Sequence, residues 1–290
     1  MTVSVVMITY GHEMFIEEAI NGVLMQDCSF PIELIIADDQ SPDGTAAVVK
    51  RCSQNHPKGH LIKYLVRSKN LGMIENFRTA LKDVKGKYIA LCEGDDYWTD
   101  PSKLQRQVDF LELNIGYGMV SENGIVLNTT KNTQYNFSVK GERDIQLSDL
   151  LDKRSFPTAS VMFRTHFLDE KFFALTQLGD TILWCYLITK GKIKYFPNVS
   201  SVYRRGIQGI VESSDRLEWA NLMENWNGEI SNFLPPGFDK KILKRRNYDE
   251  FLKALLHSSA NKQFRAAFAA FIKCFKYQPL RAIKALTKIM

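Results

Sequence analysis

Three carboxylates stand within four residues in Glu93-Gly94-Asp95-Asp96. They follow an apolar run, residues 88–92, that predicts a buried strand ending at this cluster. Like charges this close repel one another unless a cation lies between them. Such oxygen ligands suit Mg²⁺ or Mn²⁺, which proteins commonly hold with one or two carboxylates and the phosphates of a substrate. The same residues also suit a solvated turn or a helix N-cap, so this pattern alone leaves both interpretations open.

Two earlier segments predict the elements that position this cluster. Apolar runs at residues 3–8 and 32–37 read as buried strands, and each precedes a polar loop and a segment with helical spacing, residues 13–25 and 46–54. Alternating strands and helices predict a parallel sheet that binds ligands beyond the carboxyl ends of its strands. The two loops and the acidic cluster are therefore expected along one edge of one sheet.

Taken together, these segments resemble the family 2 glycosyltransferases of the GT-A fold, over about residues 3–210. The resemblance implies an α/β, Rossmann-like fold with a mostly parallel sheet and flanking helices. It also implies an inverting hexosyl- or N-acetylhexosaminyltransferase that uses a nucleotide-diphospho-sugar, most commonly a UDP-sugar, and Mn²⁺ or Mg²⁺. The segments that carry it are residues 4–10, residues 35–45, Asn70-Leu71-Gly72 with Asn76, and residues 86–91 leading into Glu93-Gly94-Asp95-Asp96.

The resemblance also assigns the donor site. It places Thr9, Tyr10 and Asp39 around the nucleotide base and ribose, with Asn70 beside them, and it makes Asp95 and Asp96 the metal and diphosphate motif. Glu93 stands in the first acidic place, where the family more often has Asp. These roles suit the side chains, because a carboxylate accepts hydrogen bonds from a base or a ribose and a tyrosine ring stacks on a base. One of Asp38 and Asp39 alternatively caps the following helix.

An inverting transfer needs one general base for the acceptor hydroxyl. Asp180, at the start of a predicted helix over residues 182–189, resembles the family's acidic position beneath the acceptor site. The alternative is that Asp180 only caps this helix, and Asp169 and Glu170 are then the nearest competitors. Residues 157–164 resemble the strand before the acceptor helix, where Thr158 and Ser160 either line the acceptor cleft or are ordinary strand residues.

The chain departs from the family pattern after Tyr203-Arg204. Many members place a His in the following loop, but residues 204–209 read Arg-Arg-Gly-Ile-Gln-Gly. Arg204 is the candidate for contacting the donor diphosphate instead, since a guanidinium suits phosphate oxygens.

Charge and composition divide the chain. Residues 240–290 hold nine Lys and four Arg against two acids, a net charge of +11, whereas the whole chain carries +6. We therefore expect a glycosyltransferase domain at residues 1–231, a linker at 232–239 and a basic helical tail at 240–290. Five scattered Cys indicate a reducing compartment, and we expect neither a signal peptide nor a membrane span.

The tail carries Phe264, Phe268, Phe271 and Phe275 at helical spacing. This pattern is typical of an interfacial helix on an anionic membrane, which favours a cytoplasmic protein held peripherally at the inner face of the cell membrane. The alternative is that the stripe packs on the catalytic domain or on a second subunit of a homo-oligomer. We expect no nucleic-acid partner, because no nucleic-acid module accompanies the basic tail.

The expected function is therefore sugar transfer to a saccharide or lipid-linked saccharide. A nucleotidyltransferase has the same metal and phosphate requirements, but it needs a basic phosphate loop that residues 9–14 lack. A non-catalytic, membrane-associated scaffold of the same fold is the other alternative.

Overall fold

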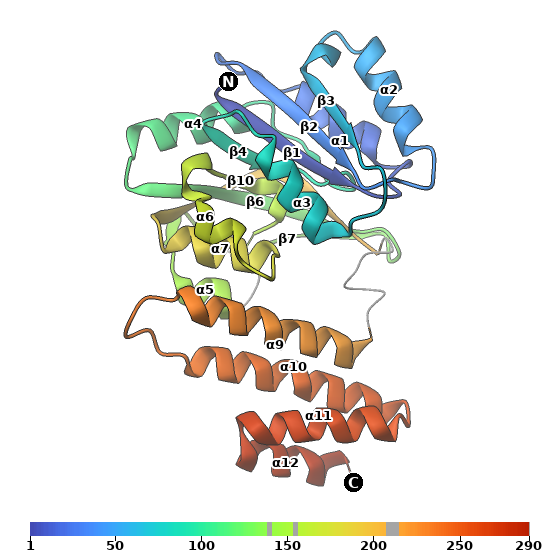
Figure 1. The fold of residues 1–290 in the computed structure, drawn as a ribbon, viewed down its shortest axis with the longest axis vertical. Helices are drawn as coiled ribbons and strands as arrows, with labels where there is room; N and C mark the ends of the chain where they lie inside the picture. Colours follow the sequence, from blue (N-terminus) through green and yellow to red (C-terminus); the bar gives the residue numbers. More distant parts are fainter. Residues whose placement is uncertain (138–140, 153–155, 207–214, 290) are drawn as a thin grey trace. The chain divides into compact units, whose positions relative to one another are not determined.

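The computed structural model describes residues 1–137, 141–152, 156–206 and 215–289, with side chains described as far as residue 285 (Figure 1). These residues form two compact units. The first comprises residues 1–146, 154–174 and 187–205, and the second comprises residues 147–153, 175–186 and 206–290. The expected division at residues 232–239 rests on composition and stays a prediction. In the structure, residues 234–240 connect helix α9 (Arg216–Phe233) to helix α10 (Lys241–Ala260).

The first unit is built on one sheet whose strands lie in the order β3-β2-β1-β4-β9-β6-β10-β5, with β7 beside β6 and β8 beside β10. Strands β1, β2, β3 and β4 pair in parallel, as do β6 and β10. Strand β9 is antiparallel to both β4 and β6 and joins the two parallel groups. This is the mostly parallel α/β architecture expected from the sequence. The strands are β1 (Val3–Thr9), β2 (Ile32–Asp38), β3 (Ile62–Val66), β4 (Tyr88–Leu91), β5 (Tyr97–Trp98), β6 (Tyr117–Asn128), β7 (Thr133–Asn136), β8 (Arg143–Ile145), β9 (Met162–Arg164) and β10 (Lys192–Arg205).

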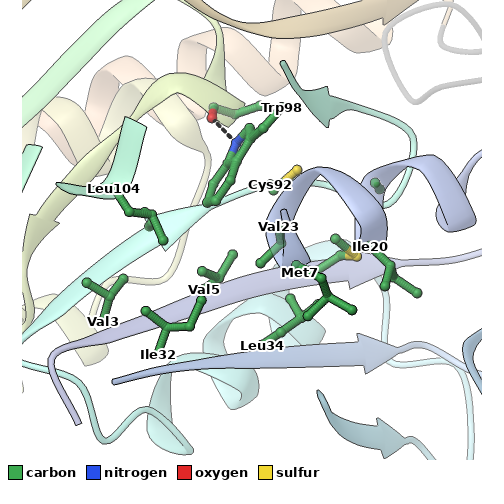
Figure 2. Packing of buried hydrophobic residues seen from close by; sticks show 14 of the residues in the cluster. Val3, Val5, Met7, Ile20, Val23, Ile32, Leu34, Cys92, Trp98 and Leu104 are labelled. Atoms are coloured by element: carbon green, nitrogen blue, oxygen red, sulfur yellow. Dashed lines mark hydrogen bonds between the residues drawn. The ribbon is translucent and has the colours of Figure 1, made fainter. Parts of the chain in front are cut away.

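Helices cover both faces of this sheet. Apolar side chains of α1, α2 and α4 form one buried cluster with alternate residues of β1 and β2 (Figure 2). Helix α3 also contacts β1 and β2 but contributes nothing to that cluster, so it covers the opposite face. Strands buried on both faces explain the continuous apolar runs of the sequence. The helices of this unit are α1 (Ile16–Leu24), α2 (Thr45–Asn55), α3 (Met73–Lys82), α4 (Lys103–Leu113) and α6 (Glu170–Phe173), with short 3₁₀ turns at Gly59–Leu61, Thr158–Ser160 and Thr165–Phe167.

Two predicted elements start later than expected. Helix α1 begins at Ile16 and not at Glu13, because the backbone and carboxylate of Glu13 bond to Asp43 and Gly44 of the next loop, at 3.0 and 2.9 Å. The strand predicted from residue 157 begins at Met162. Its first half is a 3₁₀ turn, since the backbone N–H and the hydroxyl of Ser160 both donate to the Pro157 carbonyl.

Trp98 of strand β5 anchors the acidic segment to the core beneath it. Its side chain is buried, and its indole N–H donates to the Ala159 carbonyl at 2.6 Å, the dashed line in Figure 2. The backbone of Trp98 also lies against Gly22 of helix α1, where an added Cβ would stand 2.8 Å from the Trp98 nitrogen. Glycine therefore permits the close contact of α1 with β5.

The second unit is helical. It contains α5 (Leu147–Asp152), most of α7 (Asp180–Ile188), and the series α9, α10, α11 (Phe264–Tyr277) and α12 (Pro279–Ile289). Helix α10 packs against α9 and α11, and α12 packs against α11 and α10 (Figure 1). The helical C-terminal region expected from the sequence is thus present. In the part of the chain that is described, no helix is both long enough and apolar enough to cross a membrane.

We predict that Gly22→Ala destabilises the protein by up to about 2 kcal/mol. Alanine normally stabilises a helix by about 1 kcal/mol relative to glycine, but overpacking against the Trp98 backbone costs about 1–3 kcal/mol. Gly228→Ala in α9 is the matched control, because nothing lies within 4 Å of its added Cβ. Urea unfolding should show a lower midpoint for Gly22→Ala and a midpoint at or above wild type for Gly228→Ala. Equal gains in both variants contradict the proposed contact.

Candidate active site at the carboxyl edge of the sheet

The three polar loops meet at one edge of the sheet, as the sequence predicts. Thr9 lies opposite Asp38 in the parallel pairing of β1 with β2. Beyond the strands, the Asp39 N–H donates to the Thr9 carbonyl and the Gly94 N–H donates to the Ile8 carbonyl, both at 3.0 Å. The end of β1 therefore lies between the loop that carries Asp39 and the acidic turn, residues 93–96.

Asp39 orders the loop that follows β3. Its two carboxylate oxygens accept from the backbone N–H groups of Leu71 and Gly72, at 2.7 and 2.8 Å. The residue is buried, and each oxygen keeps a second lone pair for a ligand. Asn70 stands on the same loop, is exposed, and accepts from the Gly72 N–H at 3.0 Å. Asp39 therefore links its own loop to that of Asn70.

Neither Asp38 nor Asp39 caps helix α2, so this alternative interpretation of the pair is wrong. The cap residue is Gly44, which has no side chain to accept from the first N–H groups of the helix. The carboxylate near the helix start is Asp43, which accepts from the Thr45 N–H and hydroxyl at 3.1 and 2.6 Å. Asp38 instead accepts from the Tyr64 hydroxyl at 2.5 Å, and burial together with this bond raises the pKa of Tyr64.

Tyr10 and Thr9 differ in exposure. Tyr10 is half exposed, so its ring is open to stacking by a flat ligand. Thr9 is buried, and its hydroxyl has no hydrogen-bond partner among the residues the structure describes. That oxygen lies 2.8 Å from the position of a Cβ added at Gly94. Glycine at position 94 therefore keeps the acidic turn close to the end of β1.

The acidic turn presents two different carboxylates. The Asp95 side chain is 28% exposed, and one of its oxygens lies 4.0 Å from the Nε2 atom of His12. Asp96 is fully buried, and its Oδ1 atom accepts from the backbone N–H of Arg204 at 2.9 Å. Asp95 is thus the one that faces solvent, whereas Asp96 also holds strand β10.

Arg204 fixes this turn from the other side. Its guanidinium donates to the Asp95 carbonyl at 2.7 Å, pairs with the Glu18 carboxylate of helix α1, and lies over the Tyr97 ring at 4.4 Å. The residue is buried, so these contacts connect α1, the acidic turn and β10. The contact between Arg204 and a donor diphosphate stays a prediction. The other members of the expected loop, residues 207–209, lie outside the described residues.

The acidic turn suits a metal that is shared with a ligand. Among the described residues, no three His, Cys, Asp or Glu side chains are placed to hold a metal by themselves. Mg²⁺ and Mn²⁺ need only one or two carboxylates when phosphates supply further oxygens, and the partly exposed Asp95 can supply one of them. The His12 imidazole beside it is a residue that the sequence reasoning missed, because nothing in its spacing links it to Asp95 over 83 positions.

Asp180 lies in the second unit, at the first position of α7. Its carboxylate accepts from the N–H of the next residue, Thr181, at 2.6 Å. Burial lowers the pKa of the nearby Arg246, and the Cys185 thiol and the Asp180 carboxylate act in the opposite direction. Asp180 thus lies near the Arg246 guanidinium of α10. Its role as the base stays a prediction.

The competing acids and the acceptor-strand hydroxyls have structural partners. Asp169 caps α6 by accepting from the Phe172 N–H at 3.1 Å, and it pairs with Lys190 at 2.7 Å. Glu170 stands in the first turn of that short helix. Thr158 and Ser160 are buried. Asp169 is therefore already used to stabilise this segment.

The sequence matches the profile of glycosyl transferase family 2 over residues 4–170. The chain belongs to this family. An uncharacterized protein of Mycobacterium tuberculosis is 34% identical over 215 residues, which cover 73% of this chain and 61% of that protein. A putative teichuronic acid biosynthesis glycosyltransferase of Bacillus subtilis, TuaG, is 24% identical over 237 residues, covering 77% and 85% of the two chains. This chain thus spans about three-fifths of the length of its mycobacterial relatives.

Solved glycosyltransferases share the fold of this family 2 member. A crystal structure of S. aureus TarS 1-349 in complex with UDP-GlcNAc aligns with a TM-score of 0.74 and 18% identity, covering 97% of this chain and 83% of that one. The mannosyltransferase PcManGT of Pyrobaculum calidifontis, in complex with GDP-Man and Mn²⁺, aligns at 0.60 and 20%, covering 99% and 86%. At these identities the likeness shows the fold, and the expected GT-A fold is confirmed.

We predict that Arg204→Ala lowers the free energy of unfolding of this family 2 glycosyltransferase by about 2–3 kcal/mol. Removing one partner of a fully buried ion pair usually costs more free energy than this. The expected loss is smaller here because Glu18 is half exposed, so solvent screens its charge once Arg204 is gone. Arg51→Ala is the matched control, since it removes an exposed pair with Glu17 on the same helix α1 and should cost at most about 0.5 kcal/mol. Urea unfolding measures both, and equal effects contradict the role assigned to Arg204.

Proposed function

We propose that this protein is an inverting, metal-dependent glycosyltransferase that takes its sugar from a nucleotide-diphospho-sugar, with a UDP-sugar as the preferred donor. The observation that carries the proposal is the meeting of Tyr10, Asp39 and Asp95 at one edge of the sheet. These residues offer a ring for a base, a carboxylate for a ribose and a carboxylate for a metal. The ligands of two similar proteins support a nucleotide-sugar donor, since TarS was solved with UDP-GlcNAc and PcManGT with GDP-Man.

In this proposal the first unit binds the donor. The exposed ring of Tyr10 stacks on the base, and Asp39 accepts from the base or the ribose through its remaining lone pairs. The Thr9 hydroxyl and the exposed Asn70 supply further hydrogen bonds beside it. Because Asp39 also holds the backbone of the Asn70 loop, donor contacts on both loops depend on one carboxylate.

In this proposal the acidic turn faces the donor diphosphate and would hold a divalent cation there. Asp95 and Asp96 would hold Mn²⁺ or Mg²⁺, which supplies a Lewis acid that neutralises charge on the departing nucleoside diphosphate. Asp95 contributes an exposed oxygen, and Asp96 has one oxygen on the Arg204 N–H. Arg204 contributes positive charge on the same side and keeps the turn in place. The Mn²⁺ in the PcManGT complex supports this assignment.

The transfer step itself requires a base and an acceptor hydroxyl. The acceptor oxygen attacks the anomeric carbon as the bond to the diphosphate oxygen breaks, and the nucleoside diphosphate departs from the opposite face. The acceptor proton passes to the carboxylate of Asp180. Inversion follows from this single displacement. Proton NMR of the first product should show the opposite anomeric configuration from the donor.

We further propose that the acceptor is a saccharide or a lipid-linked saccharide, and that the enzyme works peripherally at the cytoplasmic face of the cell membrane. The name of TuaG supports a polysaccharide product, and the net charge of +11 in residues 240–290 supports a position near anionic lipid. A non-catalytic scaffold of the same fold would bind a nucleotide-sugar and leave it intact. Slow, metal-dependent hydrolysis of UDP-sugars separates the two.

We predict that Asp95→Asn lowers the Mn²⁺-dependent affinity for UDP at least tenfold while the fold is retained. The variant keeps the size of the side chain and removes the exposed negative charge that faces solvent. Isothermal titration with and without Mn²⁺ measures the effect. Asp109→Asn on α4 is the control, because that exposed carboxylate bonds only to Gln105 among the described partners and should leave binding unchanged. Unchanged Mn²⁺-dependent binding in Asp95→Asn would falsify the metal assignment.

We predict that Asp180→Asn leaves donor affinity within about twofold of wild type and lowers kcat of transfer by roughly 10²–10⁴. Asparagine keeps an oxygen for the Thr181 N–H but is not basic enough to take the acceptor proton. Asp169→Asn is the matched control, since it keeps the cap of α6 and removes the competing carboxylate. Both variants are assayed on an acceptor that the wild type uses. If Asp180→Asn keeps near-normal turnover and Asp169→Asn loses turnover, Asp169 and not Asp180 is the base.

A further inference from the structure

Helices α11 and α12 present an exposed apolar surface that the fold of the second unit does not use. Four large apolar residues follow the i, i+4, i+8, i+11 spacing of one helical face on α11, and two more stand on α12. Their exposed fractions lie between 46% and 78%. We call these six residues the apolar patch: Phe264, Phe268, Ile272, Phe275, Leu280 and Ile283.

The opposite side of α11 fills the core of the unit. Ala270 and Cys274 are buried and belong to one cluster with Phe251 and Leu255 of α10. Phe271, expected in one stripe with its three neighbours, packs against this cluster and does not belong to the exposed face. The helix therefore has two apolar sides, and only the inner side has a partner among the described residues.

The charges that α11 and α12 themselves carry are of one sign. Residues 251–290 contain eight Lys and Arg and no Asp or Glu. Three exposed basic residues, Arg265, Arg281 and Lys284, directly follow patch residues in the sequence and so stand at the border of the patch. Lys273 and Lys276 also stand on α11, where both pair with Glu224 of α9.

We propose that the apolar patch inserts into the interface of an anionic lipid membrane, with Arg265, Arg281 and Lys284 on the phospholipid headgroups. An apolar face bordered by basic residues is the composition that binds lipid interfaces. A second copy of the chain fits this surface less well, since it would bring the same basic residues against their own kind. The biological purpose of this membrane binding rests on the proposed lipid-linked acceptor. The binding of the patch to lipid does not itself depend on catalysis.

The test uses the full chain and sedimentation with vesicles of two parts phosphatidylcholine and one part phosphatidylglycerol. The triple variant Phe264→Ser, Phe268→Ser, Ile272→Ser should lower the partition coefficient at least tenfold, because these side chains are exposed and their loss removes apolar contact with lipid. The matched control is Leu113→Ser with Ile115→Ser, two apolar residues of the first unit that are at least as exposed, which should bind like wild type.

A charge variant separates the two contributions. Arg265→Gln, Arg281→Gln, Lys284→Gln should bind phosphatidylglycerol vesicles at least tenfold more weakly at low salt and lose most of the salt dependence of the wild type. On pure phosphatidylcholine it should bind as the wild type does. Circular dichroism confirms that each variant is folded.

Two results overturn the inference. One is wild-type protein that does not sediment with anionic vesicles at low salt. The other result has two parts: sedimentation velocity shows a wild-type dimer and a monomeric serine variant, and the two proteins bind vesicles equally well. That result would assign the patch to contact with a second copy of the chain. Mn²⁺-dependent UDP binding is measured on the same samples. A variant that no longer binds vesicles but still binds UDP leaves the proposed function intact. Wild-type protein that binds vesicles but does not bind UDP contradicts only the proposed function.

Discussion

The parallel pairing of β1 with β2 and β4 is the constraint on which the candidate site depends. It places the ends of three strands at one edge, so that the Asp39 loop and the acidic turn lie on either side of Thr9. A shift of one residue in either register would turn every side chain of that strand to the other face of the sheet. The apolar cluster that alternate residues of β1 and β2 form with α1, α2 and α4 holds this register. Packing far from the ligand thus determines where the carboxylates lie.

The second constraint is the cost of placing acidic residues close together. Asp96 is fully buried, Asp95 faces solvent, and Arg204 bonds to both through different atoms. Glu18 in turn balances the guanidinium, so the turn is held without using the exposed carboxylate of Asp95. An ion pair between a buried guanidinium and a half-exposed carboxylate contributes little net stability, but it fixes geometry. The arrangement leaves Asp95 available to a cation.

The sequence predicts these features unequally, and for physical reasons. Strands β1, β2 and β4 follow from local apolar runs, and the expected edge follows from their alternation with helices. The pairing of Arg204 with Glu18 spans 186 positions, and that of His12 with Asp95 spans 83, so no local pattern reveals either. Helical spacing alone places Phe271 with Phe268 and Phe275. Phe271 lies near the border between the two apolar faces of α11. Its side chain packs on the buried cluster that α10 and α11 form.

The basic residues of the C-terminal region show why net charge is a poor guide to a binding surface. Glu224 accepts hydrogen bonds from Lys273, Tyr277 and Lys276, and although its burial acts in the opposite direction, these bonds lower its pKa. Arg245 and Lys253 pair with the two acids of α10.

Arg246 is largely desolvated, and this burial lowers its pKa. Asp249 and Glu250 are already counted in the +11, so within the helical unit it is Glu224 and the burial of Arg246 that reduce it further. Exposed basic residues stand on α10, at Lys241 and Lys244, and again on α11 and α12, where the sequence after residue 260 has no acid. The exposed apolar side chains stand on the same two helices, α11 and α12. Attraction to an anionic surface and the burial of apolar area would therefore act at the same place, which the charge total alone does not indicate.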